Sequence, residues 1–297
     1  GYQAGQIAAQ DLLGGIAVPT GCVVRPQQVC QLDSKDIGDG DWLALAQACG
    51  QQLADPQVAA VVITHGTDTL EETAWFLQCV LPAGKPVVLT CAMRPASALS
   101  ADGPANLRDA LACAADGGAL AWAQAGQPVL VVAAGEVHSA AAVRKAHAYQ
   151  VHALSSAPAG PVAWVEEGRL RWAQRLPQQV VVKNAVPLPP LPWPWVEVVT
   201  SHAGARAEGV DALVAAGVRG LVVAGTGNGT VHAAWLPALQ RARAAGVPIV
   251  RTTRCAEGRI VQAPGQDDAE VVDLPPLKAR ISLMLRCMSP SVPRPSP

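Results

Sequence analysis

Apolar runs of strand length alternate with segments of helical periodicity along most of this chain. We expect strands at Val58–Ile63, Pro86–Thr90, Val129–Ala133, Val196–Thr200, Leu221–Ala224 and Pro248–Arg251. We expect helices at Asp41–Leu53, Leu70–Val80, Pro104–Ala115, Gly209–Ala216, Val231–Ala245 and Pro276–Cys287. The strands are continuously apolar rather than alternating, which is typical of a parallel sheet covered on both faces. The pattern therefore predicts the α/β fold class.

A segment dense in proline interrupts this alternation at residues 185–195. Such a segment cannot form a helix or a central strand, and it favours a semi-rigid spacer. We therefore predict a larger N-terminal parallel-sheet domain over residues 1–175, a linker over 176–195 and a smaller C-terminal α/β domain over 196–288. A proline-rich recognition ligand is the alternative interpretation of the linker. Residues 289–297 have the composition of a disordered tail.

The richest polar segment is the turn Thr64-His65-Gly66-Thr67-Asp68-Thr69, between a predicted strand and a predicted helix. It presents hydroxyls, an imidazole and a carboxylate at the carboxyl end of a strand, where ligands bind in open α/β sheets. The alternative is helix capping, because Thr69 and Glu72 have the spacing of a capping box and Asp68 could act as the cap. Capping accounts for only part of this cluster.

Thr67 would need a base to act as a nucleophile. Lys145 is a candidate, because it follows the predicted strand Val129–Ala133 and a lysine partly removed from water can serve as a base. A solvated loop lysine is the alternative interpretation, and it is favoured while these residues are taken alone.

Two further turns give weaker indications of a functional site. Asp102 and Gly103, before Pro104, indicate a turn into a helix. Residues 225–230, Gly-Thr-Gly-Asn-Gly-Thr, fit neither phosphate-loop template, so a glycine turn that lets the backbone approach a ligand is the better interpretation.

Composition narrows the function classes. The net charge is −1 with no charged block, which gives no indication of a nucleic-acid or membrane partner, and no apolar stretch is long enough to span a membrane. The eight cysteines form no C-x-x-C pair, so we expect no metal site and mostly buried free thiols. Free thiols favour a reducing compartment.

The segment Val61–Ala74 resembles the second signature of the bacterial L-asparaginase/glutaminase family, the threonine amidohydrolases. The resemblance extends over nearly the whole chain. Its further segments are Asp33–Asp36, Ala92–Pro95, Ser100–Pro104, Asn106-Leu107, Ala224–Gly229 and Lys278–Arg280.

The resemblance implies hydrolysis of the side-chain amide of L-asparagine, and often of L-glutamine, without a metal or organic cofactor. In the family, a threonine near the N-terminus attacks the amide and forms an acyl-enzyme, helped by a tyrosine on a mobile loop, which here is Tyr2. A second triad falls on Thr67, Asp68 and Lys145, and it activates water or relays protons.

The resemblance also implies a substrate-binding set. Asp68 binds the α-ammonium group and Ser34 the α-carboxylate, with Gly66 and Thr67 beside them. Members are homotetramers in which the neighbour's C-terminal domain completes each site, here around Asn228. Lys35 departs from the family pattern, and its charge could strengthen carboxylate binding or alter selectivity.

A second departure concerns the first family signature, a strand ending in Thr-Gly-Gly-Thr-Ile, which is absent from these 297 residues. We expect the sequence to begin just downstream of the nucleophile, and the N-terminal domain to pack loosely or aggregate without that strand. The leading hypothesis is an asparaginase in the cytoplasm, because periplasmic members can carry a disulfide for which no matching cysteine pair is found here. The periplasm is left open. A catalytically silent amino-acid-binding homologue is the alternative, and an asparaginase-like transamidase subunit acting on charged tRNA is a distant third.

Overall fold

The computed structural model describes residues 8–174, 186–261 and 270–288. Two compact units divide between Leu188 and Pro189, inside the segment assigned to the linker. Tyr2, residues 176–185 of that linker and the tail 289–297 lie outside the described residues.

The described part of the first unit holds four α-helices and eight strands, with 3₁₀ turns at η1 (Asp11–Leu13) and η2 (Ser34–Asp36). Its helices are α1 (Asp39–Ala54), α2 (Leu70–Val80), α3 (Gly103–Ala114) and α4 (Gly117–Gln124). Its strands are β1 (Val61–Thr64), β2 (Val87–Thr90), β3 (Val129–Ala133), β4 (Glu136–Ser139), β5 (Arg144–Lys145), β6 (Leu154–Ser155), β7 (Ala163–Glu166) and β8 (Arg169–Trp172).

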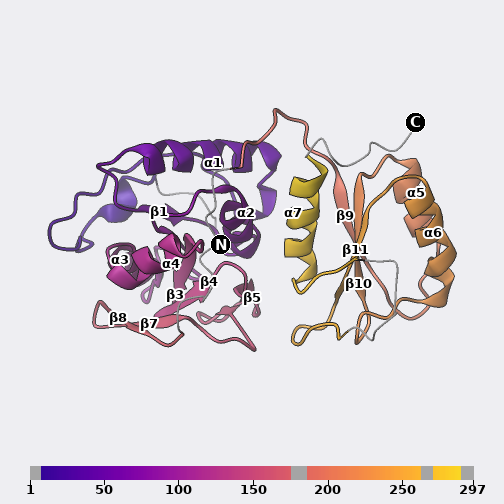
Figure 1. Ribbon diagram of the computed structural model, residues 1–297. Coiled ribbons are helices and arrows are strands. Elements are labelled where there is room, and N and C mark those ends of the chain that lie inside the picture. Colours follow the sequence, from indigo (N-terminus) through magenta and orange to yellow (C-terminus); the bar gives the residue numbers. More distant parts are fainter. Residues whose placement is uncertain (1–7, 175–185, 262–269, 289–297) are drawn as a thin grey trace. The chain divides into compact units, whose positions relative to one another are not determined.

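Six of these strands form one mixed sheet, in the order β1-β2-β3-β4-β7-β8 (Figure 1). Strands β1, β2 and β3 are parallel, as predicted, and β2 and β3 are buried along their whole length. Strands β4, β7 and β8 add an antiparallel half that the sequence analysis missed. The α/β prediction is confirmed, but the sheet is only half parallel.

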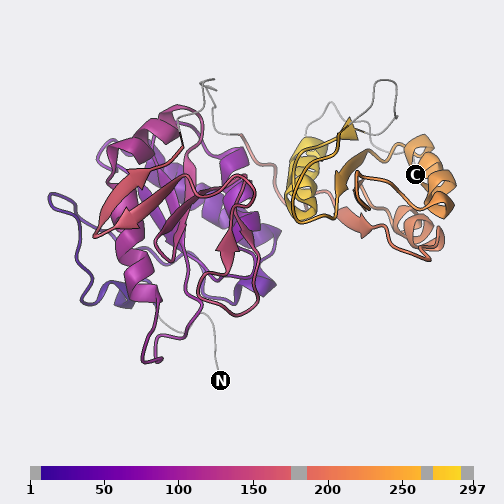
Figure 2. The ribbon, with the colours of Figure 1, turned by 90° about the horizontal axis from the view of Figure 1, so that it is seen from below.

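Two tight turns create the antiparallel half. Ala134 and Gly135 join β3 to β4, and Glu167 and Gly168 join β7 to β8; all four have positive φ. Consecutive residues with positive φ form the type I′ turn, whose twist matches a two-residue hairpin. The β7–β8 hairpin, pink in Figure 2, ends the sheet on this side. Alanine and glutamate lead these turns in place of the usual asparagine or aspartate, so the signal was weak.

The sheet of the first unit is covered on both faces. On one face, residues of α3 and α4 form a core with Val88, Leu130 and Val132 of the central strands. Alternate residues such as Leu89 and Val131 are equally buried on the opposite face. There Trp42 of α1 stacks on Phe76 of α2, with ring centroids 4.9 Å apart.

Strand β1 forms the other end of this sheet and is less buried than β2. The amide of Val61 donates to Pro86 and that of His65 to Thr90, so the backbone groups of Val62 and Thr64 point away from β2. A cavity of about 660 Å³ runs along this outer edge. Its walls come from β1, α1, α3 and residues 9–30.

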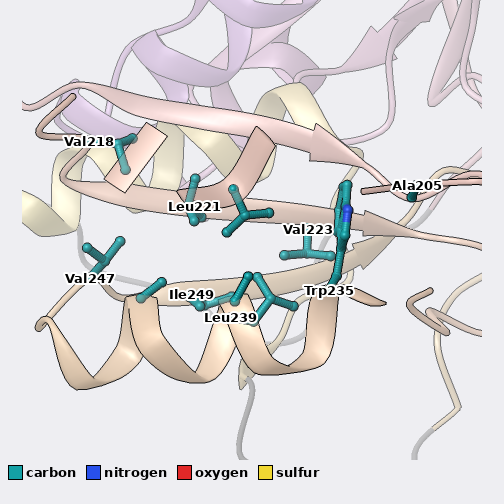
Figure 3. Packing of buried hydrophobic residues seen from close by; sticks show 11 residues of the cluster. Ala205, Val218, Leu221, Val223, Trp235, Leu239, Val247 and Ile249 are labelled. Atoms are coloured by element: carbon teal, nitrogen blue, oxygen red, sulfur yellow. The ribbon is translucent and has the colours of Figure 1, made fainter. Parts of the chain in front are cut away.

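The second unit is a three-layer α/β/α domain (Figure 1). Its strands are β9 (Val196–Thr200), β10 (Gly220–Gly225), β11 (Ile249–Thr253) and β12 (Glu270–Val271), all parallel, in the order β12-β11-β10-β9. Its helices are α5 (Glu208–Ala215), α6 (Leu236–Ala244) and α7 (Pro276–Cys287). Figure 3 shows Leu221 and Val223 of β10 packed against Trp235 and Leu239 on the α6 side.

Several element boundaries differ from the prediction by one to three residues, and two differences that concern helices are larger. Helix α4 was missed, and the helix predicted over Val231–Ala245 begins only at Leu236. It is preceded by the 3₁₀ turn η3 (Ala233–Trp235), where the His232 ring accepts the amide of Ala234. Pro237 lies in the first turn of α6, where its missing N–H is tolerated. Among the described residues, no helix is long and apolar enough to cross a membrane.

Candidate active site

The turn after β1 brings Thr67 and Asp68 together with Lys145 of β5, although Lys145 is 78 residues away from Thr67. Lys145 Nζ lies 2.8 Å from Thr67 Oγ1 and also contacts the Asp68 carboxylate. The Lys145 side chain is 17% exposed and that of Asp68 is 52% exposed. Lys145 is therefore not a solvated loop lysine, because the fold holds its ammonium group against a hydroxyl and a carboxylate.

Ser34 lies directly beneath this turn. Its hydroxyl oxygen accepts the amide of Asp68 at 3.2 Å, and the Ser34 residue is 2% exposed. A Cβ atom on Gly66 would lie 2.6 Å from Ser34 Oγ, a distance that side chains do not tolerate. The glycine therefore allows the serine loop and the threonine turn to touch.

The capping-box interpretation of Thr69 is wrong. Thr69 stands at the N-cap of α2 but its side chain caps no helical amide. Its Oγ1 instead donates to the carbonyl oxygen of Ser34 at 2.7 Å. The hydroxyl thus joins the two loops that carry Asp68 and Ser34, which a local pattern cannot reveal.

His65 belongs to a hydrogen-bond network that holds the turn in place. Its Nδ1 lies 2.6 Å from the Gly66 carbonyl oxygen, so this nitrogen carries the hydrogen and donates. Its Nε2 then accepts from Thr73 Oγ1 at 2.9 Å, and Thr73 in turn accepts from Trp42 Nε1 at 3.0 Å. Burial lowers the pKa of His65, although the Gly66 carbonyl works in the opposite direction. The neutral imidazole therefore links the Gly66 carbonyl to the Thr73 hydroxyl.

Glu71, in the first turn of α2, makes a contact that the sequence analysis missed. Its Oε2 accepts the backbone amide of Lys145 at 2.7 Å. The acidic first turn was visible in the sequence as a helix-start signal. Its partner lies 74 residues away, so the sequence held no signal for the contact.

Lys35 is engaged elsewhere. Its ammonium group lies 2.5 Å from the Asp36 carboxylate and 3.5 Å from that of Asp33. The pKa of Lys35 is raised, mainly by its hydrogen bond with Asp36. The Lys35 side chain is 59% exposed. The lysine charge is thus balanced by its own loop.

The loop after β2 turns into helix α3 at Gly103, as predicted. Both Asp102 carboxylate oxygens accept backbone amides, from Met93 and from Arg94, each at 2.9 Å. Asn106 Nδ2 donates to the Cys91 carbonyl, also at 2.9 Å, and its Oδ1 accepts the Ala134 amide. These bonds hold the loop onto the sheet.

In the second unit, Asn228 lies in the glycine turn after β10. Its Nδ2 donates to the Val261 carbonyl oxygen and its Oδ1 accepts the Val261 amide, at 2.8 and 2.7 Å. A Cβ on Gly225 would lie 2.5 Å from the carbonyl carbon of Gly229. The glycines let the turn close on itself, while the approach of its backbone to a ligand stays a prediction.

The eight cysteines have free thiols, but only Cys49, Cys91 and Cys113 are buried, which corrects the prediction of mostly buried thiols. Burial raises the pKa of Cys91 to about 12, mainly by desolvation, so this thiol stays protonated near the triad. Within the part of the chain that the structure describes, no three His, Cys, Asp or Glu side chains are grouped to hold a metal ion.

The large cavity beside β1 is a separate feature. It reaches Thr64 and His65 but is lined mainly by apolar residues of β1, α1, α3 and the 9–30 segment. Thr67, Asp68 and Lys145 are not among its lining residues. Tyr2, the remaining catalytic candidate, lies outside the described residues.

Comparisons with known proteins match residues of both units. The family profile described as "Asparaginase, N-terminal" matches residues 2–178, and "Glutaminase/Asparaginase C-terminal domain" matches residues 195–291. The chain is 34% identical to the "Probable L-asparaginase periplasmic" of Haemophilus influenzae, over 96% of this chain and 81% of that protein. It is 36% identical to the "Glutaminase-asparaginase" of Pseudomonas fluorescens biotype A, over 96% and 79%.

A solved structure is similar over both units. The crystal structure of a probable cytoplasmic L-asparaginase from Campylobacter jejuni matches with a TM-score of 0.83 and 31% identity, covering 95% of this chain and 90% of that one. The resemblance seen in the sequence is thus confirmed by the fold and by long alignments. This chain belongs to the asparaginase/glutaminase family of amidohydrolases.

Proposed function

We propose that the protein hydrolyses the side-chain amide of L-asparagine to L-aspartate and ammonia, with L-glutamine as a possible second substrate. The contact of Lys145 Nζ with Thr67 Oγ1, at 2.8 Å, carries this proposal. A hydroxyl beside an amine and a carboxylate is a unit that can move a proton to or from a reacting group. Relatives named as L-asparaginases and glutaminase-asparaginases support the substrate class.

In this proposal, Thr67, Asp68 and Lys145 activate the water that releases the acyl group. Asp68 also binds the substrate's α-ammonium group, which its 52% exposed carboxylate can reach. Ser34 accepts the Asp68 amide, and its own hydroxyl hydrogen is directed to the α-carboxylate. Gly66 leaves room for this serine.

The acyl group would be carried by a second threonine, helped by Tyr2. No Thr-Gly-Gly-Thr strand occurs in these 297 residues. The outward backbone groups of Val62 and Thr64, with the apolar cavity of about 660 Å³ beside them, support β1 as the place where such a strand would pair. Its carboxyl end would then lie beside the turn that carries Thr67.

Ammonia release from L-asparagine tests the proposal. Two proteins are compared, the chain as written and the same chain preceded by a strand ending in Thr-Gly-Gly-Thr-Ile, each with a Thr67→Ala control. We expect release by the extended protein and its loss in the control. Release by the unextended chain that Thr67→Ala abolishes would mean that Thr67 can act without the N-terminal threonine, and the division of roles between the two threonines would need revision. No release by either protein would refute the hydrolase.

A catalytically silent amino-acid-binding homologue is the second candidate. The set of Ser34, Gly66 and Asp68 favours it, because these residues recognise an amino acid without needing a nucleophile. Calorimetric titration with L-aspartate decides between the two functions when no ammonia is released. Binding without hydrolysis supports the silent protein, and absence of both excludes it.

Two further features belong to the same proposal. We place the protein in the cytoplasm as a homotetramer, with Asn228 of a neighbouring copy completing each site. Relatives bear both cytoplasmic and periplasmic names, so fractionation of the source cells is the test of location. Light scattering of the purified protein measures the assembly, and an Asn228→Ala variant tests the shared site.

A further inference from the structure

Lys145 is held at two points by residues from one short segment. Its Nζ contacts Thr67 and Asp68, and its backbone amide donates to Glu71 Oε2 at 2.7 Å. Thr67, Asp68 and Glu71 all lie within five consecutive residues, at the end of the turn and in the first turn of α2. One rigid element therefore fixes both the side chain and the backbone of the lysine.

The backbone contact matters because β5 does not belong to the main sheet. It pairs only with β6, in a separate two-stranded sheet of two residues per strand. Ala146 bonds to Ala153 across this pair, so the amide of Lys145, one residue earlier, points away from β6. The outward amide points to α2, where Glu71 receives it.

We propose that Glu71 is a positioning residue for the hydrolysis, which makes this inference rest on the proposed function. Its carboxylate holds the β5 backbone in the position from which Lys145 Nζ reaches Thr67 Oγ1. A misplacement of about 1 Å can cost about a hundredfold in rate, so this contact is expected to control catalysis without touching substrate.

The reach of the side chain and its charge can be separated by two conservative variants. Glu71→Gln keeps an acceptor oxygen at the same distance and removes the charge. Glu71→Asp keeps the charge and shortens the side chain by one methylene group, so the oxygen no longer reaches the Lys145 amide. Glu72→Asp, the same change one residue further along the same helical turn, is the matched control.

Two measurements are made on these variants. Hydrogen exchange of the Lys145 amide, followed by nitrogen-15 NMR, reads the contact directly. We expect Glu71→Asp to exchange at least about tenfold faster than the wild type and Glu71→Gln to stay within about threefold. In the form of the protein that releases ammonia, we expect Glu71→Asp to lower kcat about a hundredfold with the KM for L-asparagine within about threefold. Glu71→Gln should restore kcat to within about fivefold, and Glu72→Asp should match the wild type.

The two possible failures look different. Equal Lys145 exchange rates in the wild type, Glu71→Gln and Glu71→Asp would overturn the positioning role, whether or not ammonia is released. A Glu71→Gln variant with a low kcat beside a Glu71→Asp variant with a kcat close to that of the wild type would also overturn it. The charge of residue 71, rather than the reach of its side chain, would then matter. Absence of ammonia release from the unsubstituted protein that carries the added Thr-Gly-Gly-Thr-Ile strand would refute the hydrolase, while the exchange rates still decide the contact. Thermal melts show whether each variant is folded.

Discussion

Gly66 and Ser34 are in contact so close that no side chain fits between them: a Cβ on Gly66 would lie 2.6 Å from Ser34 Oγ and 2.8 Å from Ser34 Cβ. Thr69 Oγ1 donates to the carbonyl oxygen of the same serine at 2.7 Å. The loop that carries Ser34, the proposed partner of the substrate carboxylate, is thus packed directly against the turn that carries Thr67 and Asp68.

Replacing Gly66 should weaken ligand binding in a protein that still folds. In Gly66→Ala the new methyl group must displace Ser34, which we expect to cost about 1–3 kcal/mol of stability as an overpacked contact. Because the serine hydroxyl moves, we also expect the affinity for L-aspartate to fall at least about tenfold. Calorimetric titration and thermal unfolding measure the two effects. Unchanged affinity in a folded variant would contradict the assignment of Ser34 to the ligand.

Ser34 and its neighbour Lys35 should differ sharply. Removing the Ser34 hydroxyl in Ser34→Ala deletes a hydrogen bond to a charged ligand group, worth about 1.5–3 kcal/mol, and so about a tenfold to hundredfold loss of L-aspartate affinity. Lys35→Ala should change the affinity less than about threefold, since the Lys35 ammonium is paired with Asp36 and Asp33. Titrations of the two variants under identical salt make the comparison. A large loss in Lys35→Ala would instead assign the lysine to the substrate carboxylate.

Removal of the Lys145 amine should stop turnover with little change in the fold. Lys145→Met keeps the length and the apolar stem of the side chain, so melting should stay close to the wild type. Loss of a proton-transferring group typically costs about 10²–10⁴-fold in rate. Ammonia release in the active form of the protein measures this loss, with Lys85→Met as a control lysine that caps α1 by binding the Leu53 and Asp55 carbonyls. Turnover that survives in Lys145→Met would remove the triad from the mechanism.

His65 should make the stability of the first unit depend on pH. The folded state lowers the pKa of His65, through burial, below its ordinary value of 6.5. The unfolded chain therefore binds the proton more readily, and stability present above pH 6.5 is lost as the pH falls towards the folded pKa. The loss is about 1.4 kcal/mol for each pH unit that separates the two values. Denaturant unfolding from pH 8 to pH 5 measures the slope, and His65→Gln should be flatter over the same window. Identical slopes would contradict the buried neutral imidazole.

The glycine turn after β10 gives a test in the second unit. Gly225→Ala places a methyl group 2.5 Å from the backbone of Gly229, and we expect a loss of about 2–3 kcal/mol. Gly209→Ala is the matched control, because this glycine lies in α5 with no atom within 4 Å of the added Cβ. It should stabilise the unit by about 0.5–1 kcal/mol. Chemical unfolding ranks the two variants, and the reverse order would refute this account of the turn.

Much of the architecture was predictable because it depends on local periodicity. Continuous apolar runs located β2, β3 and β10, and helical spacing located α2 and α7 to the residue. The antiparallel half was missed because β4, β7 and β8 are short and partly polar, and because their pairing depends on two turns with positive φ. Glycine follows many kinds of turn, so the sequence did not distinguish these two.

The sequence by itself determined the α/β fold class, the proline-rich break and the composition of the turn from Thr64 to Thr69, because apolar periodicity and residue type are local properties. Only the tertiary structure decided what each polar group contacts. It turned Lys145 from a loop lysine into the partner of Thr67, and Thr69 from a helix cap into a tie to Ser34. It also gave Glu71 its partner. These contacts join residues 35 to 78 positions apart, and a chain brings such residues together only through the packing of its sheet and helices.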